Sequence, residues 1–264
     1  APSSLPPSLY SPSAIAPLRA RPRARHKPFA SFARAFGSIA SVEDADLLIC
    51  DMAGTTIEEG GLVYSTLRKV INEDGMICTE VDIHEWHGAK KETVIEHFAR
   101  INGTHKTEIP TRVARVGDRF SVALHEAYFK SQDKIRLIHP NILLFFDRLR
   151  AKGVKVALNT GYPPEIQESL VEHLELKQHI DTYISAYDVP HGRPYPYMIH
   201  TVMQRLGLPD VRRVAKVGDT VRDIEEGKNA GCGLVVGVLS GADDEVTLRA
   251  AGADRIVGYV NELK

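Results

Sequence analysis

Short apolar runs alternate with amphipathic stretches from residue 43 onward, and this alternation sets the predicted architecture. The runs are rich in branched apolar side chains and lack a polar face, as expected for strands that are buried on both sides of a sheet. The predicted strands are residues 45–50, 154–158, 182–186, 213–217, 234–238 and 255–257.

Helical periodicity fills the intervals between most of these runs, at residues 141–152, 164–174, 196–206 and 221–230. Gly231 lies just past the last of these segments, where glycine commonly ends a helix. Strands that alternate with helices are typical of parallel sheets with helices on both faces. The pattern therefore predicts an α/β fold with a doubly wound, mainly parallel sheet.

One long segment departs from this rhythm, because residues 58–137 read almost wholly as helix. The helices expected there are residues 64–73, 89–101 and 111–131. Since the segment follows the first strand directly, it is predicted to be a cap domain over the carboxyl ends of the strands, where open α/β sheets bind ligands. The core domain then comprises residues 43–57 and 138–264.

Composition narrows the classes of partner. The 264 residues carry 33 basic and 34 acidic side chains, so the net charge of -1 offers no general attraction for nucleic acid or an anionic membrane. No apolar run approaches the roughly 18 to 20 residues that span a bilayer. The three cysteines lack C-x-x-C spacing and fit neither a disulfide framework nor a zinc site. We expect a small-molecule substrate, no nucleic acid or membrane partner, and a reducing compartment.

The first 42 residues differ from the rest, since they contain arginine, serine, proline and alanine but no Asp or Glu. An Arg-rich, Ser-rich and acid-free segment is typical of an organellar transit peptide, whereas a secretory signal would need a longer apolar run. The prediction is a location in a chloroplast or mitochondrion. If residues 1–42 are instead a disordered basic tail, the expected location is the cytoplasm.

Two predicted strands end in carboxylates. Asp51 ends the first strand and is followed by a glycine and two threonines, while Asp219 follows the fourth strand and Asp223 lies one helical turn further on. An aspartate before a glycine is also common in turns. Because parallel strands end at the same sheet edge, the three acids together predict a pocket for a hard cation such as Mg²⁺, with Asp51 as a candidate nucleophile.

Two further strand ends supply groups that bind anions. Thr160, followed by Gly161 and Tyr162, places a hydroxyl beside a turn, where it can donate to a phosphoryl oxygen. Arg193 lies in a proline-rich loop after the next strand, where a planar cation can be held against an anion. All four strand ends are expected at one edge of one sheet.

These motifs, in this order, resemble those of the haloacid dehalogenase superfamily: D-x-x-G-T from Asp51, Thr160, the basic Arg193, and G-D-x-x-x-D from Gly218 to Asp223. The resemblance covers about residues 46–257 and implies a Rossmann-like core with an inserted cap. It also implies that Asp51 attacks phosphorus to form an aspartyl-phosphate. By the same resemblance, Mg²⁺ is held by Asp51, the Ala53 carbonyl, Asp219 and Asp223.

Ala53 distinguishes subfamilies within the superfamily. Phosphatases and phosphomutases carry a second Asp two residues after the nucleophile, as the acid that protonates the leaving oxygen, and a methyl group cannot take that role. D-x-A-G-T-T, T-G-Y at residues 160–162 and D-V-P-x-G-R-P-Y-P at residues 188–196 instead resemble the phosphonatases. This resemblance implies that Gly161 and Tyr162 contact the substrate.

A carbon–phosphorus bond needs an electron sink on carbon, and phosphonatases supply it with a cap lysine in a G-x-x-K element. Gly88 to Lys91 places Lys91 at that position, although the spacing alone also fits a solvated helix start. Lys90 and the nearby helix amino terminus are expected to lower the pKa of Lys91. The family's histidine three residues later is Val94 here, and its methionine before the glycine is His87, a candidate replacement base that contacts the substrate.

The resemblance implies a Mg²⁺-dependent hydrolase that cleaves the carbon–phosphorus bond of phosphonoacetaldehyde or a close phosphonate. Lys91 forms an imine, Asp51 takes the phosphoryl group, and Thr160 and Arg193 hold its oxygens. A homodimer formed through the caps is also expected. The alternatives are a phosphatase or phosphoryl transferase for a small phosphorylated metabolite, in which cap lysines only bind anions, and a non-catalytic magnesium or phosphate-binding module.

Overall fold

A computed structural model describes residues 39–130 and 135–264. Its main sheet has the strand order β5-β4-β1-β6-β7-β8, and every neighbouring pair is parallel. After β1, the chain adds β4 and β5 on one side of it and then β6, β7 and β8 on the other side. This order confirms the prediction of a doubly wound sheet. The strands are β1 (Leu47–Asp51), β4 (Lys155–Thr160), β5 (Thr182–Ser185), β6 (Val214–Gly218), β7 (Leu234–Val238) and β8 (Arg255–Val257).

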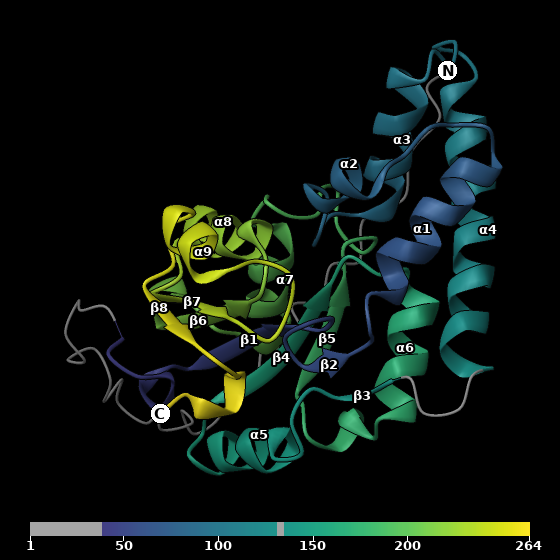
Figure 1. Cartoon of the computed structure of the whole chain (residues 1–264). Coiled ribbons are helices and arrows are strands. Elements are labelled where there is room, and N and C mark those ends of the chain that lie inside the picture. Colours follow the sequence, from purple (N-terminus) through teal and green to yellow (C-terminus); the bar gives the residue numbers. More distant parts are fainter. Residues whose placement is uncertain (1–38, 131–134) are drawn as a thin grey trace, which may run out of the picture. The chain divides into compact units, whose positions relative to one another are not determined.

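Helices cover both faces of this sheet. In Figure 1, α5 lies below the strands, α7 and α8 lie above them, and α9 lies beside β7 and β8. The helix α6 stands to the right of β5 in this view and packs into the same apolar cluster as α5. These helices are α5 (Ile142–Ala151), α6 (Pro164–His173), α7 (Tyr197–Leu206), α8 (Val221–Ala230) and α9 (Glu245–Ala250). Gly231 ends α8 with a left-handed φ of 82°, as predicted. Single 3-10 turns occur at Val42–Asp44, Leu176–Gln178, Val211–Arg213 and Val260–Glu262.

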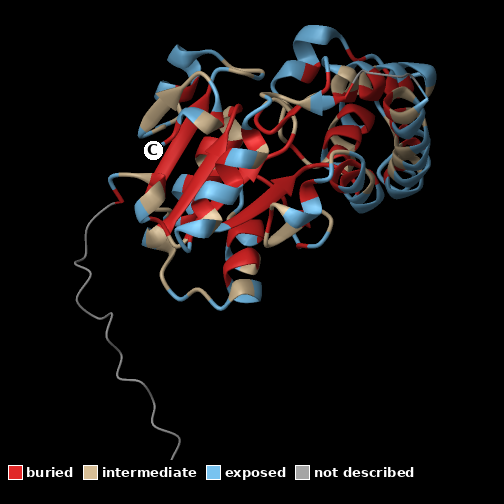
Figure 2. Ribbon diagram, turned by 90° about the horizontal axis from the view of Figure 1, so that it is seen from below, coloured by how far each residue is buried: buried red, intermediate tan, exposed pale blue. Residues whose placement is uncertain are grey.

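The central strand shows why its apolar run is continuous. Leu48 and Cys50 pack into the same cluster as Phe146 of α5, whereas Leu47 and Ile49 pack with α7 on the opposite face. Because successive side chains point to opposite faces, a strand covered by helices on both sides is expected to be apolar at most positions. Figure 2 shows the central strands of the sheet as buried, whereas the edge strand β8 is only partly buried.

Four helices and an antiparallel pair of short strands interrupt the core between β1 and β4. The helix α4 (Ile109–Phe129) packs against both α1 (Leu62–Glu73) and α3 (Lys91–Ile101), with Phe120 and Leu124 fully buried. The short strands β2 (Ile57–Glu58) and β3 (Arg136–Leu137) pair antiparallel where the chain enters and leaves the helical insertion.

Sequence periodicity missed the shortest elements. The helix α2 (Glu80–His84) has five residues, too few to show a period, and a capping box between Thr79 and Asp82 begins it. The pair of β2 and β3 has only two residues in each strand, so no alternation could reveal it. The helix expected from residue 89 begins at Lys91, with Lys90 as its N-cap.

The first residues that the structure describes pack into the apolar core of the main domain. Ile39 and Val42, which the sequence grouped with the basic leader, are buried in the main apolar cluster, and the Val42 amide donates to the Lys264 carbonyl at 3.1 Å. The leader up to residue 38, and with it the targeting prediction, lies outside the described residues. None of the helices described has both the length and the apolar character needed to span a membrane.

Candidate active site

A cavity of about 310 Å³ lies at the carboxyl edge of the sheet. Core loops form one side of it, and the segment from β2 to the start of α3 forms the other. Nine of the ten predicted site residues line it, and the tenth, Asp223, lies directly behind it. The lining residues among the predictions are Asp51, Ala53, His87, Lys91, Thr160, Gly161, Tyr162, Arg193 and Asp219.

Three buried carboxylates meet beside this cavity. Each of Asp51, Asp219 and Asp223 offers one oxygen, and these oxygens lie within 4.8 Å of one another. Glycines make the close approach possible, since a Cβ on Gly218 would overlap the Asp223 carboxylate, and a Cβ on Gly241 would overlap that of Asp219. The G-D spacing in the sequence therefore reflects packing as well as chemistry.

Positive side chains neutralise the three carboxylates to different extents, and Asp219 is the least neutralised. Burial, followed by the charges of Asp51 and Asp223, holds the pKa of Asp219 well above its usual range. Asp219 accepts only from neutral donors within the described chain, the Thr55 hydroxyl at 3.0 Å and the Ala242 amide at 2.9 Å. Burial also raises the pKa of Asp51, although Arg193 opposes this. This donor set, together with the unbalanced negative charge, fits a hard divalent cation.

Asp223 differs from the other two acids because protein cations already neutralise it. Lys216 Nζ lies 2.7 Å from its carboxylate, and the Thr220 hydroxyl donates to the other oxygen at 2.6 Å. Burial opposes ionisation, but the positive charges of Arg193 and Lys216 outweigh it and lower the pKa of Asp223. Asp223 therefore holds Lys216 and Arg193 in place and is also a candidate metal ligand.

Arg193 is held on several sides at the cavity wall. Its guanidinium contacts Asp51 Oδ1 at 2.7 Å and Glu226 Oε2 at 3.1 Å, and it donates to the Asn159 carbonyl at 2.9 Å. Desolvation disfavours the guanidinium charge, but Asp223 and Asp51 outweigh it and raise the pKa of Arg193. A fully buried, fixed cation beside the candidate nucleophile suits the binding of an anion.

Sequence reasoning missed the network behind Arg193. Lys216 is fully buried inside β6, where it contacts Asn159 Oδ1 at 2.8 Å and Glu226 Oε2 at 3.4 Å. One signal was available, because a lysine in the middle of the apolar run at residues 213–217 must find partners if that run is a buried strand.

Replacing Lys216 with methionine is expected to lower the free energy of unfolding by about 3 to 5 kcal/mol, because it leaves buried acids without their cation. Urea unfolding of the full chain measures this. The matched control is Lys155→Met on β4, whose lysine makes a half-exposed ion pair with Asp181 and should cost less than about 1 kcal/mol. Equal losses from the two substitutions would contradict the structural role of Lys216.

Lys91 is the first residue of α3, yet its side chain is buried. Its Nζ donates to the Tyr64 hydroxyl at 2.9 Å and to the Ala89 carbonyl at 2.8 Å. Burial lowers the pKa of Lys91 to about 7, against the opposing charge of Asp51 and with help from Arg193. The amine can therefore be neutral near physiological pH.

The predicted direction of this shift is confirmed, but Lys90 is not its main cause. Lys90 was expected to lower the pKa of its neighbour, but its ammonium lies 3.1 Å from Glu92 and 4.4 Å from the centre of the Tyr187 ring. The largest cause is desolvation by parts of the chain that are distant in sequence. The reading of Lys91 as part of a solvated helix start is therefore also wrong.

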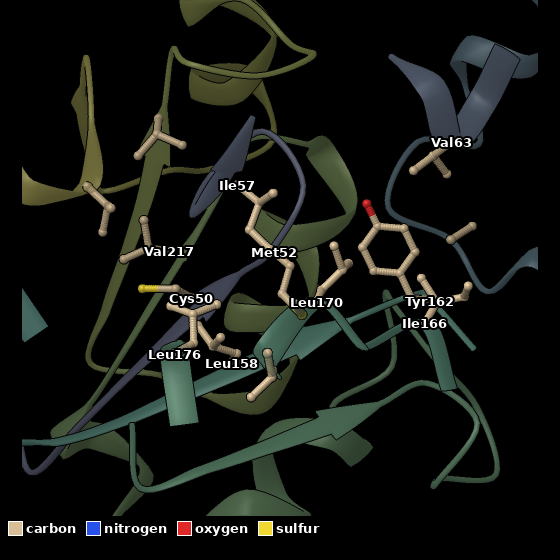
Figure 3. Packing of buried hydrophobic residues seen from close by; sticks show 14 of the residues in the cluster. Cys50, Met52, Ile57, Val63, Leu158, Tyr162, Ile166, Leu170, Leu176 and Val217 are labelled. Carbon is tan, nitrogen blue, oxygen red and sulfur yellow. The ribbon is translucent and has the colours of Figure 1, made fainter. Parts of the chain in front are cut away.

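Tyr162 joins the core to the insertion. Its hydroxyl lies 2.9 Å from that of Tyr128, which in turn donates to Glu59 Oε2 at 3.1 Å. Figure 3 shows the Tyr162 hydroxyl on the side of Val63, above an apolar floor that includes Met52. Glu59 also accepts from the amides of residues 61 and 63. No sequence signal pointed to Glu59 or Tyr128, because their partners come from distant segments.

The loop before α3 lies directly on the core. A Cβ on Gly161 would come within 2.6 Å of the Ala89 carbonyl oxygen, and one on Gly88 within 2.7 Å of the Thr220 hydroxyl. The ring of His87 stacks on Tyr64 with centroids 3.9 Å apart. Burial lowers the pKa of His87 to about 4, so the imidazole is neutral at pH 7.

Comparison with known proteins shows to which enzyme family the chain belongs. Residues 45–231 match the family model of haloacid dehalogenase-like hydrolases, so the chain belongs to this family and is an enzyme. At the level of single proteins, it is 30% identical over 217 residues to phosphonoacetaldehyde hydrolase of Bacillus cereus strain B4264, with 75% of this chain and 77% of the relative covered.

Two further relatives agree with that similarity. The phosphonoacetaldehyde hydrolase of Parabacteroides distasonis is 30% identical over 207 residues, covering 75% of this chain and 77% of its own. The crystal structure of a phosphonoacetaldehyde hydrolase-like protein from Oleispira antarctica has a TM-score of 0.70 at 25% identity, covering 85% of this chain and 91% of that one. Both the fold and the relatives therefore agree with the resemblance seen in the motifs.

Proposed function

We propose that this hydrolase cleaves the carbon–phosphorus bond of phosphonoacetaldehyde or a close phosphonate, releasing phosphate and an aldehyde. The observation that carries the proposal is the buried amine of Lys91, with a pKa of about 7, in the same cavity as the Asp51 carboxylate. Ala53 lines this cavity in place of an acid. The similarity to phosphonoacetaldehyde hydrolases supports the same substrate class.

Two side chains divide the chemistry. The neutral amine of Lys91 attacks the aldehyde carbon and forms an imine with loss of water, which turns the adjacent carbon into a leaving group that keeps its electron pair as an enamine. Asp51 attacks phosphorus and forms an aspartyl-phosphate. A proton added to the enamine carbon restores the imine. Water then hydrolyses both the acyl phosphate and the imine, which releases phosphate and acetaldehyde and restores the enzyme.

Arg193 and Thr160 bind the charge of the phosphoryl group and need not transfer protons. The Arg193 guanidinium, already 2.7 Å from Asp51, is placed to bind phosphoryl oxygens, and the Thr160 hydroxyl lines the same wall. Because the leaving group is carbon in an enamine, no acid is needed at Ala53.

Asp51, Asp219 and the Ala53 carbonyl, with Asp223 close by, would hold Mg²⁺. When bound, the ion supplies positive charge that offsets the crowded carboxylates and the phosphoryl oxygens. The raised pKa of Asp219 is the observation that favours it.

A phosphatase acting on a small phosphorylated metabolite is the second candidate, and one observation favours it. Val94 is fully buried where phosphonatases carry a histidine, so the insertion departs from their pattern next to Lys91. This candidate predicts turnover of phosphate esters and no covalent adduct with aldehydes. The proposed pairing of caps into a homodimer and the proposed organellar location are independent of either choice.

The deciding experiment incubates the full chain with Mg²⁺ and phosphonoacetaldehyde and follows acetaldehyde and phosphate together. Release of both in equal amounts supports carbon–phosphorus cleavage, and chelation of the metal with EDTA should abolish it. A panel of phosphate esters is the comparison. Hydrolysis of esters without acetaldehyde release would replace this proposal with the phosphatase.

The rate of imine formation is expected to rise with pH and level off above about pH 7. Only the neutral amine is nucleophilic, so below the Lys91 pKa of about 7 the rate should fall about tenfold per pH unit. Trapping the adduct with borohydride at timed intervals between pH 5.5 and 9 measures this. A rate that still rises about tenfold per pH unit up to pH 9, as an amine with the ordinary pKa of 10.5 would give, would show that Lys91 is not desolvated in the working enzyme.

A further inference from the structure

The hydroxyl of Tyr64 touches the reacting amine. Tyr64 lies in the first turn of α1 and lines the cavity, with its oxygen 2.9 Å from Lys91 Nζ. The Gly88 amide donates to the same oxygen at 2.6 Å, and Lys91 Nζ lies 4.5 Å from the centre of the ring. The phenol is therefore fixed against the amine by two hydrogen bonds and by its ring.

The hydroxyl proton of Tyr64 is available to a substrate in the cavity. A neutral amine has two N–H groups, and those of Lys91 are directed to Tyr64 and to the Ala89 carbonyl, which leaves the nitrogen lone pair free for attack. The Tyr64 oxygen accepts from Lys91 and Gly88, so its own O–H must donate elsewhere. In the parts of the chain that are described, no oxygen accepts it, and the open neighbour is the cavity.

Other proton carriers near Lys91 are engaged or turned away. Asp51 is paired with Arg193, and the Glu59 carboxylate is held by two amides and a tyrosine hydroxyl. Within residues 39–130 and 135–264, no hydrogen bond joins a ring nitrogen of His87 to Lys91, because the imidazole stacks flat on Tyr64. Val94 on the next turn of α3 carries no proton to exchange.

We propose that Tyr64 is a catalytic residue that relays a proton between Lys91 and the carbonyl oxygen of the substrate. As the C–N bond forms, the C=O π electrons move to oxygen, Tyr64 gives its hydroxyl proton to that oxygen, and the nitrogen returns a proton to Tyr64. The product is a neutral carbinolamine, and the phenol is regenerated. This role rests on the proposed imine chemistry.

The environment of the phenol agrees with a relay and not with a stable phenolate. Burial raises the pKa of Tyr64, and the negative charges of Asp51 and Asp219 raise it further. Giving and taking a proton in one step avoids an unfavourable phenolate, so the raised pKa is no obstacle.

The test is Tyr64→Phe in the full chain with Mg²⁺, which keeps the ring and its stacking on His87. Phosphonoacetaldehyde is added, the reaction is quenched with borohydride at timed intervals, and the Lys91 adduct is counted by mass spectrometry. We expect the adduct to form about 100-fold more slowly, with kcat reduced and KM nearly unchanged. Tyr187→Phe, which removes the hydroxyl of the tyrosine beside Lys90 and outside the cavity, should form the adduct at the wild-type rate.

A second variant separates proton transfer from positioning. Fluorinated tyrosine at position 64 keeps the hydroxyl and its contacts but changes its acidity, so a relay predicts a changed rate, whereas a purely structural hydroxyl predicts the wild-type rate. An unchanged rate with either Tyr64 variant, or an equal loss in Tyr187→Phe, would overturn the relay by Tyr64 and leave the proposed function standing. Absence of any adduct in the wild-type enzyme would overturn the proposed function, and this inference with it.

Discussion

Replacing Lys91 with arginine is expected to slow acetaldehyde release from phosphonoacetaldehyde by at least about 10³-fold, or about 4 kcal/mol of activation free energy. Arginine keeps a positive charge near the site, but it stays protonated and cannot form an imine. Acetaldehyde release and the borohydride-trapped adduct measure the loss. Lys90→Arg is the matched control, since Lys90 is one residue away and pairs with Glu92, and its activity should stay close to wild type.

Retention of full activity on the aldehyde by Lys91→Arg would exclude the imine. The arginine variant could instead fold poorly, so Lys91→Met provides a second measurement. Below pH 7 the buried amine is protonated in both the folded and unfolded chain, and the lowered pKa is a cost to the folded state. Between about pH 7 and 10.5 only the unfolded chain binds the proton, so stability rises with pH there.

Lys91→Met removes this cost and its pH dependence. We expect the variant to be inactive yet more stable at pH 6, by about 2 to 5 kcal/mol, with a smaller gain at pH 9. Urea unfolding at the two pH values measures the difference. A variant less stable than wild type at pH 6 would contradict the burial of the amine.

Asp51→Asn is expected to reduce phosphate release by at least about 10⁴-fold, because an amide cannot form the aspartyl-phosphate. The Lys91 adduct should still form, since Asp51 takes no part in imine formation. Following phosphate release and adduct trapping on the same sample therefore separates the two half-reactions. The fold should persist, because the substitution relieves crowding among buried carboxylates.

Asp46→Asn provides the matched control for the nucleophile. Asp46 precedes β1 at the opposite end of the strand from Asp51 and pairs with Arg213. It should keep wild-type turnover. Phosphate release by Asp51→Asn at a rate near wild type would mean that another group accepts the phosphoryl group.

The sequence by itself determined the core and the strand-end chemistry. Mainly apolar runs identified the parallel strands, because a strand buried on both faces holds a polar side chain only where it is paired, as Lys216 is. Asp51, Thr160, Arg193 and Asp219 were then predictable as neighbours, since parallel strands that carry them end at one edge. The cavity confirms that grouping.

Only the tertiary structure decided the state of the amine. Lys91 looked like any lysine at a helix start, and its burial comes from segments tens of residues away. Tyr64, Glu59 and Lys216 likewise acquire meaning from partners that local periodicity does not reveal. Periodicity reports which face of an element is buried, whereas a pKa or a hydrogen bond depends on what the rest of the chain brings to that face.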